Sequence, residues 1–160
     1  MDVTAPSLPF MRGSVDYPFG QDPRALAVRD TIAFVADAVL GVLSVRFGDP
    51  DAPSVLGAAS GSGARDLDLL GTLLLVGLGG GGVQLVDVFN PTSPSLRSTW
   101  PTPPTFGVAQ LGETGLALLG EGGALAIDMR DPDAPRTRGL IAVPGFARDA
   151  AWVGDTLLVA

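Results

Sequence analysis

Two Arg-Asp pairs are the residues whose types and spacing best suit ligand binding or catalysis. They are Arg65–Asp66 and Arg148–Asp149, and Arg24 occupies the corresponding Arg position earlier in the chain. A guanidinium group binds a carboxylate or phosphate through paired N–H donors, so this set predicts a site for an anion or a peptide. Carboxylates that converged on one place would instead provide the acid and base of a hydrolase or lyase. The competing interpretation is structural, with Arg and Asp paired locally to hold neighbouring elements in register.

The composition excludes most catalytic machinery. The chain contains no His, Cys or Lys, which excludes imidazole bases, thiolates, disulfides and most transition-metal sites. No G-x-S-x-G segment is present, and the Asp residues recur along the chain instead of clustering. We therefore expect a protein that is not an enzyme and that binds no cofactor.

Two other motifs are interpreted as turns. The segment GLGGGG at 77–82 satisfies G-x-G-x-x-G, but the strand-like VQLVDVF follows it, so no helix N-terminus would hold a phosphate. The loops with Asp49 and Asp51, and with Asp131 and Asp133, offer two carboxylates each. Ca²⁺ takes six or more oxygen ligands, so we expect solvated turns and no metal site.

The overall composition is typical of an all-β protein. Of 160 residues, 46% are hydrophobic, which is enough to fill a core. The chain has 22 Gly, 14 Pro, fifteen Asp and only two Glu, so it offers little of the Glu and Lys that cover helix surfaces. The net charge of −7 and the dispersed Arg residues disfavour binding to nucleic acid.

One stretch is as apolar as a membrane span. Residues 69–86 carry no charge, but six of them are Gly, which destabilises a helix. We expect no direct membrane insertion. The first residues, MDVTAPSLPF, lack the basic and apolar regions of a secretory signal, so a signal for export would lie outside this chain.

A repeat of 41 residues organises the chain. The segments FGDPDAP, VFNPTSP and MRDPDAP recur with both prolines at constant spacing, and Pro6 and Pro9 fit the same places 44 residues before the first of them. Other positions follow the same interval independently. They are Gly41, Gly82 and Gly123; Val45, Val86 and Ile127; and Gly57, Ser98 and Gly139.

Each unit is predicted to form four short strands. In the first full unit they fall near Ala25–Val28, Ile32–Ala36, Val42–Phe47 and Ser54–Ala58. The third strand places large apolar residues on one face and smaller or polar ones on the other. Asp-Pro then ends this strand, because Pro has no amide donor and the preceding Asp accepts hydrogen bonds from the next amides. The repeated Gly before the strand occupies a turn position that favours positive φ.

Tandem units of four antiparallel strands and about 40 residues predict a β-propeller. We expect one domain, 1–160, with about 3.5–4 blades: a partial blade at 1–23, full blades at 24–63, 64–105 and 106–146, and a partial blade at 147–160. The chain begins and ends inside a blade, so we expect part of a larger propeller with further blades in the same polypeptide. The alternative is a four-bladed ring that the two partial units complete together.

The chain resembles the LVIVD repeat family. The resemblance lies in GVLSVRFGDPDAP (41–53), GVQLVDVFNPTSP (82–94) and GALAIDMRDPDAP (123–135), and in ARDLDLLGTLLLVG (64–77) and ARDAAWVGDTLLVA (147–160). The third unit departs from it, since Phe106–Leu111 lacks the Arg-Asp pair, and Arg46 replaces the usual Asp of the first unit. Members of this family look like bacterial and archaeal cell-surface or exported propellers, so the resemblance implies an extracellular or cell-surface location.

The expected site follows from the expected fold. The first strand of a propeller blade lies nearest the axis, so Arg24, Arg65, Asp66, Arg148 and Asp149 would ring one mouth of a central channel. The predicted function is a non-catalytic scaffold, an interaction or adhesion module that binds a protein or another surface ligand. The alternative is a propeller hydrolase or lyase that uses these Asp and Arg residues. The large aromatic residues are expected to pack between blades; they are Trp100, Trp152, Phe106 and Phe146.

Overall fold

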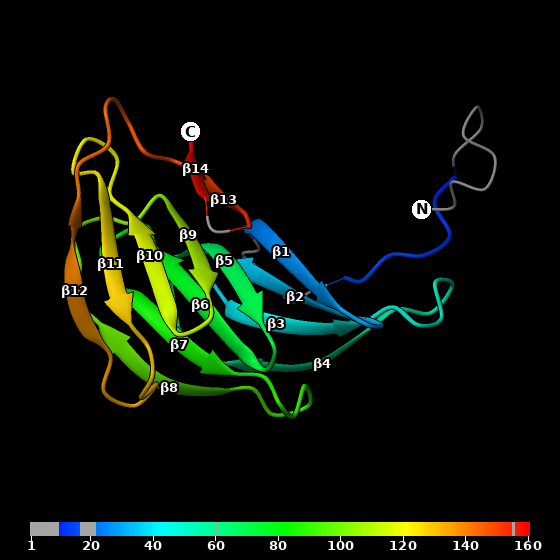
Figure 1. Cartoon of the computed structure of the whole chain (residues 1–160). Helices are drawn as coiled ribbons and strands as arrows, with labels where there is room; N and C mark the ends of the chain where they lie inside the picture. The colour runs from blue at the N-terminus through cyan, green and yellow to red at the C-terminus, as the bar shows by residue number, and fades with distance from the viewer. Residues whose placement is uncertain (1–9, 17–21, 60, 155) are drawn as a thin grey trace.

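The computed structural model describes residues 10–16, 22–59, 61–154 and 156–160. These ranges contain strands and no helix, and hence no helix long and apolar enough to cross a membrane (Figure 1). The charge-free stretch 69–86 forms the end of one strand, all of the next and most of a third. The strands are β1 (Pro23–Arg29), β2 (Ile32–Asp37), β3 (Gly41–Arg46), β4 (Ser54–Ala59), β5 (Ala64–Leu70), β6 (Leu73–Leu78), β7 (Val83–Asp87), β8 (Ser95–Trp100), β9 (Gly107–Leu111), β10 (Thr114–Leu118), β11 (Ala124–Asp128), β12 (Arg136–Ile141), β13 (Ala150–Val153) and β14 (Thr156–Val159).

The strands form sheets in the order of the sequence. Three antiparallel sheets contain β1 to β4, β5 to β8, and β9 to β12, and a hairpin contains β13 and β14. The all-β prediction is confirmed, and the four strands of the first unit agree with their predicted bounds to within two residues. Of the segment predicted as a partial blade at 1–23, residues 1–9 and 17–21 lie outside the described residues.

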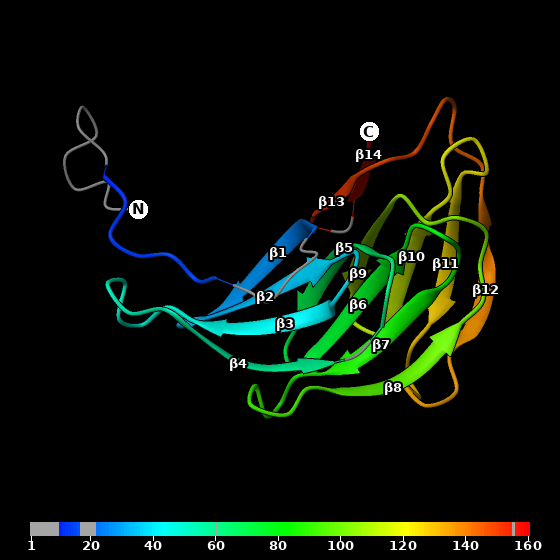
Figure 2. The same cartoon turned by 180° about the vertical axis from the view of Figure 1, so that it is seen from behind.

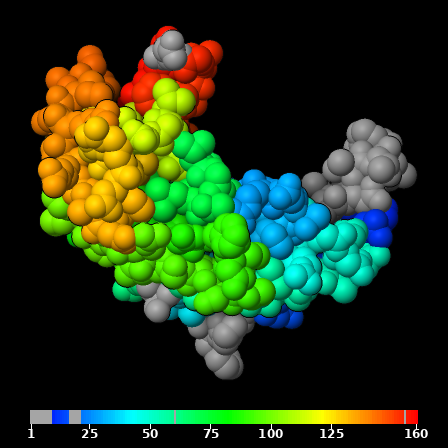
Figure 3. All heavy atoms as spheres, turned by 60° about the horizontal axis from the view of Figure 1, so that its bottom comes forward, coloured from blue at the N-terminus to red at the C-terminus, as the bar shows by residue number. Residues whose placement is uncertain are grey.

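The sheets follow one another in an arc. The first strands, β1, β5, β9 and β13, lie side by side along the inner part of the arc, whereas β4, β8 and β12 lie on its rim (Figures 1 and 2). A space-filling view shows the same open arc, from the first sheet in blue and cyan, through the second in green, to the third in yellow and orange (Figure 3). Among the described residues no strand pairing joins β13 or β14 to the first sheet.

The hydrophobic core lies between successive sheets. Phe34 of β2 packs with Leu74 of β6 in one cluster, and Leu75 of β6 packs with Ile127 of β11 in the next; all four are fully buried. The second sheet is therefore covered on both faces, which explains why β6 reads LLLVGL without polar alternation.

Burial in the third strands also extends to both faces. The smaller side chain of Ser44 in β3 faces an adjacent unit, and it is as fully buried as its apolar neighbours. Its hydroxyl donates to the carbonyl oxygens of Gly57, at 3.1 Å, and Pro91. A buried hydroxyl needs such partners, since an unpaired one destabilises the fold.

The proline loops dock on the outer strand of the preceding unit. The Ser98 hydroxyl in β8 donates to the Pro132 carbonyl at 2.6 Å. One unit earlier, Gly57 in β4 lies so close to the next loop that a Cβ would be 2.5 Å from the carbonyl oxygen of Thr92. The regular spacing of Gly57 and Ser98 thus marks the place where the next loop packs.

The Asp residues of these loops act as predicted. The Asp49 carboxylate accepts a hydrogen bond from the backbone N–H of Asp51, and Asp131 accepts one from Asp133, both at 3.0 Å. Each side chain therefore closes a local turn in its own loop. Among the described residues, no group of three or more Asp or Glu is placed to hold a metal ion.

The repeated Gly at the turn into each third strand has the predicted positive φ. The angles are 88° at Gly41, 111° at Gly82 and 80° at Gly123. The segment 77–82 is a hairpin turn between β6 and β7, in which the N–H of Gly81 donates to the carbonyl of Leu78 at 3.0 Å. The interpretation of this Gly-rich motif as a turn is confirmed.

Loop docking predicts a large effect at one position and almost none at its equivalent for the same Gly-to-Ala substitution. Gly57→Ala should lower the free energy of unfolding by about 1–3 kcal/mol, because its methyl group would collide with the Thr92 backbone. Gly139→Ala should change it by about 0.5 kcal/mol or less, since no atom lies within 4 Å of a Cβ there. Urea denaturation of the two variants measures the difference, and equal values would contradict the docking.

A candidate binding site at one end of the inner strands

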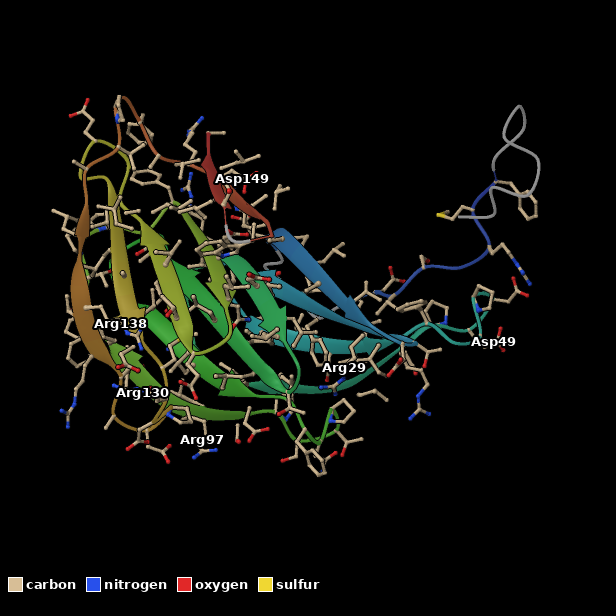
Figure 4. The ribbon with its side chains drawn as sticks, in the orientation of Figure 1. Arg29, Asp49, Arg97, Arg130, Arg138 and Asp149 are labelled. Atoms are coloured by element: carbon tan, nitrogen blue, oxygen red, sulfur yellow. The ribbon has the colours of Figure 1, made fainter. Side chains whose placement is uncertain are left out.

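The structure brings all five predicted site residues together. Arg24 lies in β1, Arg65 and Asp66 lie at the start of β5, and Arg148 and Asp149 directly precede β13. With Phe106 they line one open hollow of about 320 Å³. We call this hollow the mouth site. Asp149 is at one end of the sheets, far from Arg97, Arg130 and Arg138 at the other (Figure 4).

Two Arg residues of the mouth site lie over aromatic rings. The Arg65 guanidinium carbon is 5.0 Å from the centre of the Phe106 ring, and that of Arg148 is 5.6 Å from the centre of the Phe146 ring. The two Phe rings contact each other edge to face, with centroids 4.7 Å apart and an angle of 69° between their planes. The result is a continuous row of Arg, Phe, Phe and Arg held by cation–π and aromatic contacts.

Local charge pairing applies to only one of the predicted Arg residues. Arg24 forms an ion pair with Asp22, a partner that the sequence analysis did not identify. Within the described part of the chain, the side chains of Arg65 and Arg148 form neither an ion pair nor a hydrogen bond, and each guanidinium group lies over a Phe ring. Their guanidinium N–H groups are therefore available to an added anion.

The carboxylates of β5 hold the neighbouring strand β9. The Val108 N–H donates to Asp66 at 2.8 Å, and the Gln110 N–H donates to Asp68 at 2.7 Å. The Gln110 side-chain amide also donates to the Asp68 carbonyl at 2.6 Å. Because β9 is the first strand of its sheet, its outer N–H groups lack a strand partner, and these carboxylates provide one.

A second hollow, of about 400 Å³, shares Asp66 and Asp149 with the mouth site. Asp68 also lines it, so carboxylates from two sheets converge there, whereas its lining contains no Arg from the described residues. Trp152 forms part of the wall, and its buried indole N–H has no acceptor among the described residues. The two adjoining hollows thus differ in charge, with Arg residues only in the mouth site.

Burial raises the pKa of Asp66 above its usual value. The nearby carboxylates of Asp149 and Asp68 raise it further, because a second negative charge disfavours ionisation. The backbone N–H groups of Val108 and Leu67 oppose this by stabilising the charged form. Burial outweighs them, so Asp66 binds its proton more tightly in the folded chain than in the unfolded one.

The opposite end of the sheets shows local charge pairing. Arg97 pairs with Asp133 at 2.5 Å and with Asp87 at 3.4 Å. Asp128 pairs with Arg130 at 2.6 Å and with Arg138 at 3.3 Å. Hydrogen bonds from Arg130 hold the pKa of Asp128 well below its usual range. The structural interpretation of Arg-Asp pairs therefore fits this end, whereas it fits only Arg24 in the mouth site.

Three contributors to these hollows were not predicted as site residues. Phe106 was expected only to pack between blades, although it falls 41 residues after Arg65 and so shares its position in the repeat. Asp68 follows Asp66 by two residues and lies on the same face of β5, a signal that strand alternation provides. Trp152 was assigned to packing, and no sequence signal shows that its N–H lacks an acceptor.

Comparison with known proteins shows similarity of fold alone. No protein-family model matches the sequence, and no curated protein matches it. The crystal structure of the computationally designed Ika4 protein is similar with a TM-score of 0.74 and 10% identity, over 95% of this chain and 92% of that one. The designed Ika8 protein is similar with a TM-score of 0.67 and 10% identity, over 86% of this chain. The match spans only 42% of the Ika8 chain.

Substitutions at Asp66 should separate its hydrogen bond from its charge. Asp66→Ala should be less stable than Asp66→Asn by about 1–2 kcal/mol, because only Asn keeps an acceptor for the Val108 N–H. At pH 7 Asp66→Asn should be at least as stable as the wild type, since it removes a buried charge that lies near Asp149.

The raised pKa sets the direction of the pH dependence. Wild-type stability should rise relative to that of Asp66→Asn as pH falls from 7 towards 3.8, the reference pKa of Asp, because the folded state takes up the proton first. Urea denaturation at several pH values measures this difference. A wild type that instead lost stability relative to Asp66→Asn over this range would show that the pKa of Asp66 is lowered.

Proposed function

We propose that the chain is a non-catalytic binding module and that its ligand site is the mouth site. The single observation that carries this proposal is that Arg65 and Arg148 rest on the Phe106 and Phe146 rings without a carboxylate partner in the described part of the chain. Two cations left unpaired beside a hollow favour an anionic ligand. Arg binds such a ligand through two parallel N–H donors.

The ligand is a protein segment that carries a carboxylate. Its carboxylate binds the Arg side chains of the mouth site, and its backbone N–H groups or a cationic group turn towards Asp66 and Asp149 in the adjoining hollow. A free phosphate or nucleic acid fits less well, because the net charge of −7 repels strongly anionic ligands.

The scaffold that presents this site is a β-propeller of LVIVD type. Support comes from the consecutive four-stranded sheets, from the inner position of β1, β5, β9 and β13, and from the repeat motifs. By the same resemblance the protein works outside the cell or at its surface, as an interaction or adhesion module. The sheets that complete this propeller come either from further blades of the same polypeptide or from a second chain.

One observation favours a second candidate, a hydrolase or lyase. Asp66 and Asp149 come from different sheets and line the same two hollows, and the charge of Asp149 contributes to the raised pKa of Asp66. Against it, Asp66 already accepts the Val108 N–H and so serves to join two sheets. This use of the carboxylate favours the binding module over the enzyme.

A matched pair of peptides tests the binding site. The probe is a capped Gly-Glu-Gly peptide, and the control is the same peptide with Gln in place of Glu. Titration followed by NMR should shift the guanidinium Nε–Hε signals of Arg65 and Arg148 with the Glu peptide only. In the double variant Arg65→Gln/Arg148→Gln the affinity should fall at least about tenfold, which corresponds to about 1.4 kcal/mol.

Arg136→Gln is the control variant. Arg136 lies at the start of β12 and lines a different hollow, with Asp128 and Arg130. Like each substitution in the double variant, Arg136→Gln removes one positive charge, but it should leave the affinity unchanged. Equal binding of the Glu and Gln peptides, or an equal loss of affinity in Arg136→Gln, would show that the mouth site does not recognise carboxylates.

A further inference from the structure

The first sheet exposes a face that the other sheets bury. Leu26 in β1, Leu67 in β5 and Val108 in β9 occupy the same position in the repeat, on the face directed towards the preceding sheet. Leu67 is 7% exposed and Val108 5%, whereas Leu26 is 65% exposed. The neighbouring Val28 in β1 is exposed as well. The face of β1 thus has the residues of a buried surface, but nothing in the described ranges covers it.

We call the face of a sheet that is directed towards the next sheet its forward face, and the face directed towards the preceding sheet its rear face. The rear face is exposed in the first sheet, whereas the C-terminal hairpin exposes its forward face. Phe34, Leu75 and Leu116 occupy equivalent positions in the second strand of each sheet and are buried. Leu158 occupies this position in β14 and is 56% exposed. The hairpin therefore presents the forward face that each full sheet buries against the next.

Within the arc, a forward face always packs on a rear face. Phe34, from the forward face of the first sheet, shares a core cluster with Leu67, from the rear face of the second. Leu75 packs in the same way with Val108 of the third sheet. The exposed Leu158 and the exposed Leu26 are thus the two halves of a contact that the chain forms twice elsewhere.

Residues 10–16 mark the position of the sheet that would cover the exposed face of β1. Arg12 forms an ion pair with Asp51, and this contact is equivalent in the repeat to the pair of Arg97 in β8 with Asp133. Gly13 lies against the loop that contains Asp51, as Gly57 in β4 lies against the next one. Residues 10–16 therefore occupy the outer-strand position of a sheet in front of β1, the sheet whose inner strands would cover Leu26.

We propose that these inner strands are β13 and β14 of a second copy of this chain. The hairpin of each copy docks on the exposed face of β1 of the other, beside residues 10–16, so that two open arcs close one ring. The hairpin is the part of the chain with an exposed forward face among the described residues, and the forward face is what β1 lacks. The proposal is independent of the ligand of the mouth site.

The wild-type chain tests the assembly directly. Light scattering during size-exclusion chromatography should give twice the 16.3 kDa of one chain. Leu26→Arg alone and Leu158→Asp alone should each give 16.3 kDa, because each places a charge in both junctions of the dimer. Leu140→Arg in β12 is the matched control, since Leu140 is 63% exposed but lies on an outer strand, and this variant should stay dimeric.

A mixture of the two monomeric variants distinguishes head-to-tail docking from other dimers. One junction of the mixed dimer pairs native Leu158 with native Leu26, and the other pairs the introduced Asp with the introduced Arg. Mixing should therefore restore the dimer mass, and circular dichroism should show both variants folded. The chain has no Cys, so Leu26→Cys mixed with Leu158→Cys should also cross-link under oxidation, whereas either variant alone should not.

Several outcomes would overturn the proposal. A wild-type mass of 16.3 kDa at 100 μM would mean that the hairpin closes on its own chain or that the face is covered by further blades of a longer polypeptide. Dimeric single variants, a mixture that stays monomeric, or cross-links between two copies of Leu26→Cys would each exclude the head-to-tail junction.

Discussion

The packing of one sheet face on the next determines the rest of this structure. Each full sheet presents an apolar surface on both sides, so both sides must be covered by another sheet. In β6, the adjacent residues Leu74 and Leu75 point to opposite faces and are both fully buried. Side chains must then fit between two neighbours at once. At Gly115 a Cβ would lie 2.7 Å from the sulfur of Met129 and 2.9 Å from Leu75, so a larger residue there would displace these side chains.

Polar contacts give this apolar packing its register. Hydrophobic contact alone does not fix how far one sheet slides over another, whereas hydrogen bonds are directional. On the rim, the loop carbonyl of Pro132 receives the Ser98 hydroxyl. At the inner strands, Asp66 and Asp68 receive backbone N–H groups of β9. Neighbouring sheets are thus fixed at both ends of their width, with the hydrophobic core between the two sets of contacts.

The sequence predicts the strands well because their boundaries depend on local chemistry. The Asp-Pro loop follows the third strand and the repeated Gly lies at the turn that starts it, and both act within a few residues of themselves. Contacts between units are harder to predict from the sequence. The role of Asp68 depends on which N–H groups of β9 lack a strand partner, and that follows only from the relative placement of two sheets. Asp22, the ion-pair partner of Arg24, is only two residues away in the sequence. The sequence did not identify it, because composition alone does not show which of the nearby acidic residues forms the pair.

The row of Arg65, Phe106, Phe146 and Arg148 affects how much side-chain freedom would be lost when the mouth site binds its proposed ligand. An Arg side chain in water samples many rotamers, and this freedom is lost when it grips a ligand. Here the ring faces already restrict the two guanidinium groups during folding. The ordering penalty is therefore met before any encounter, and the anionic ligand that we propose would meet donors that need little rearrangement.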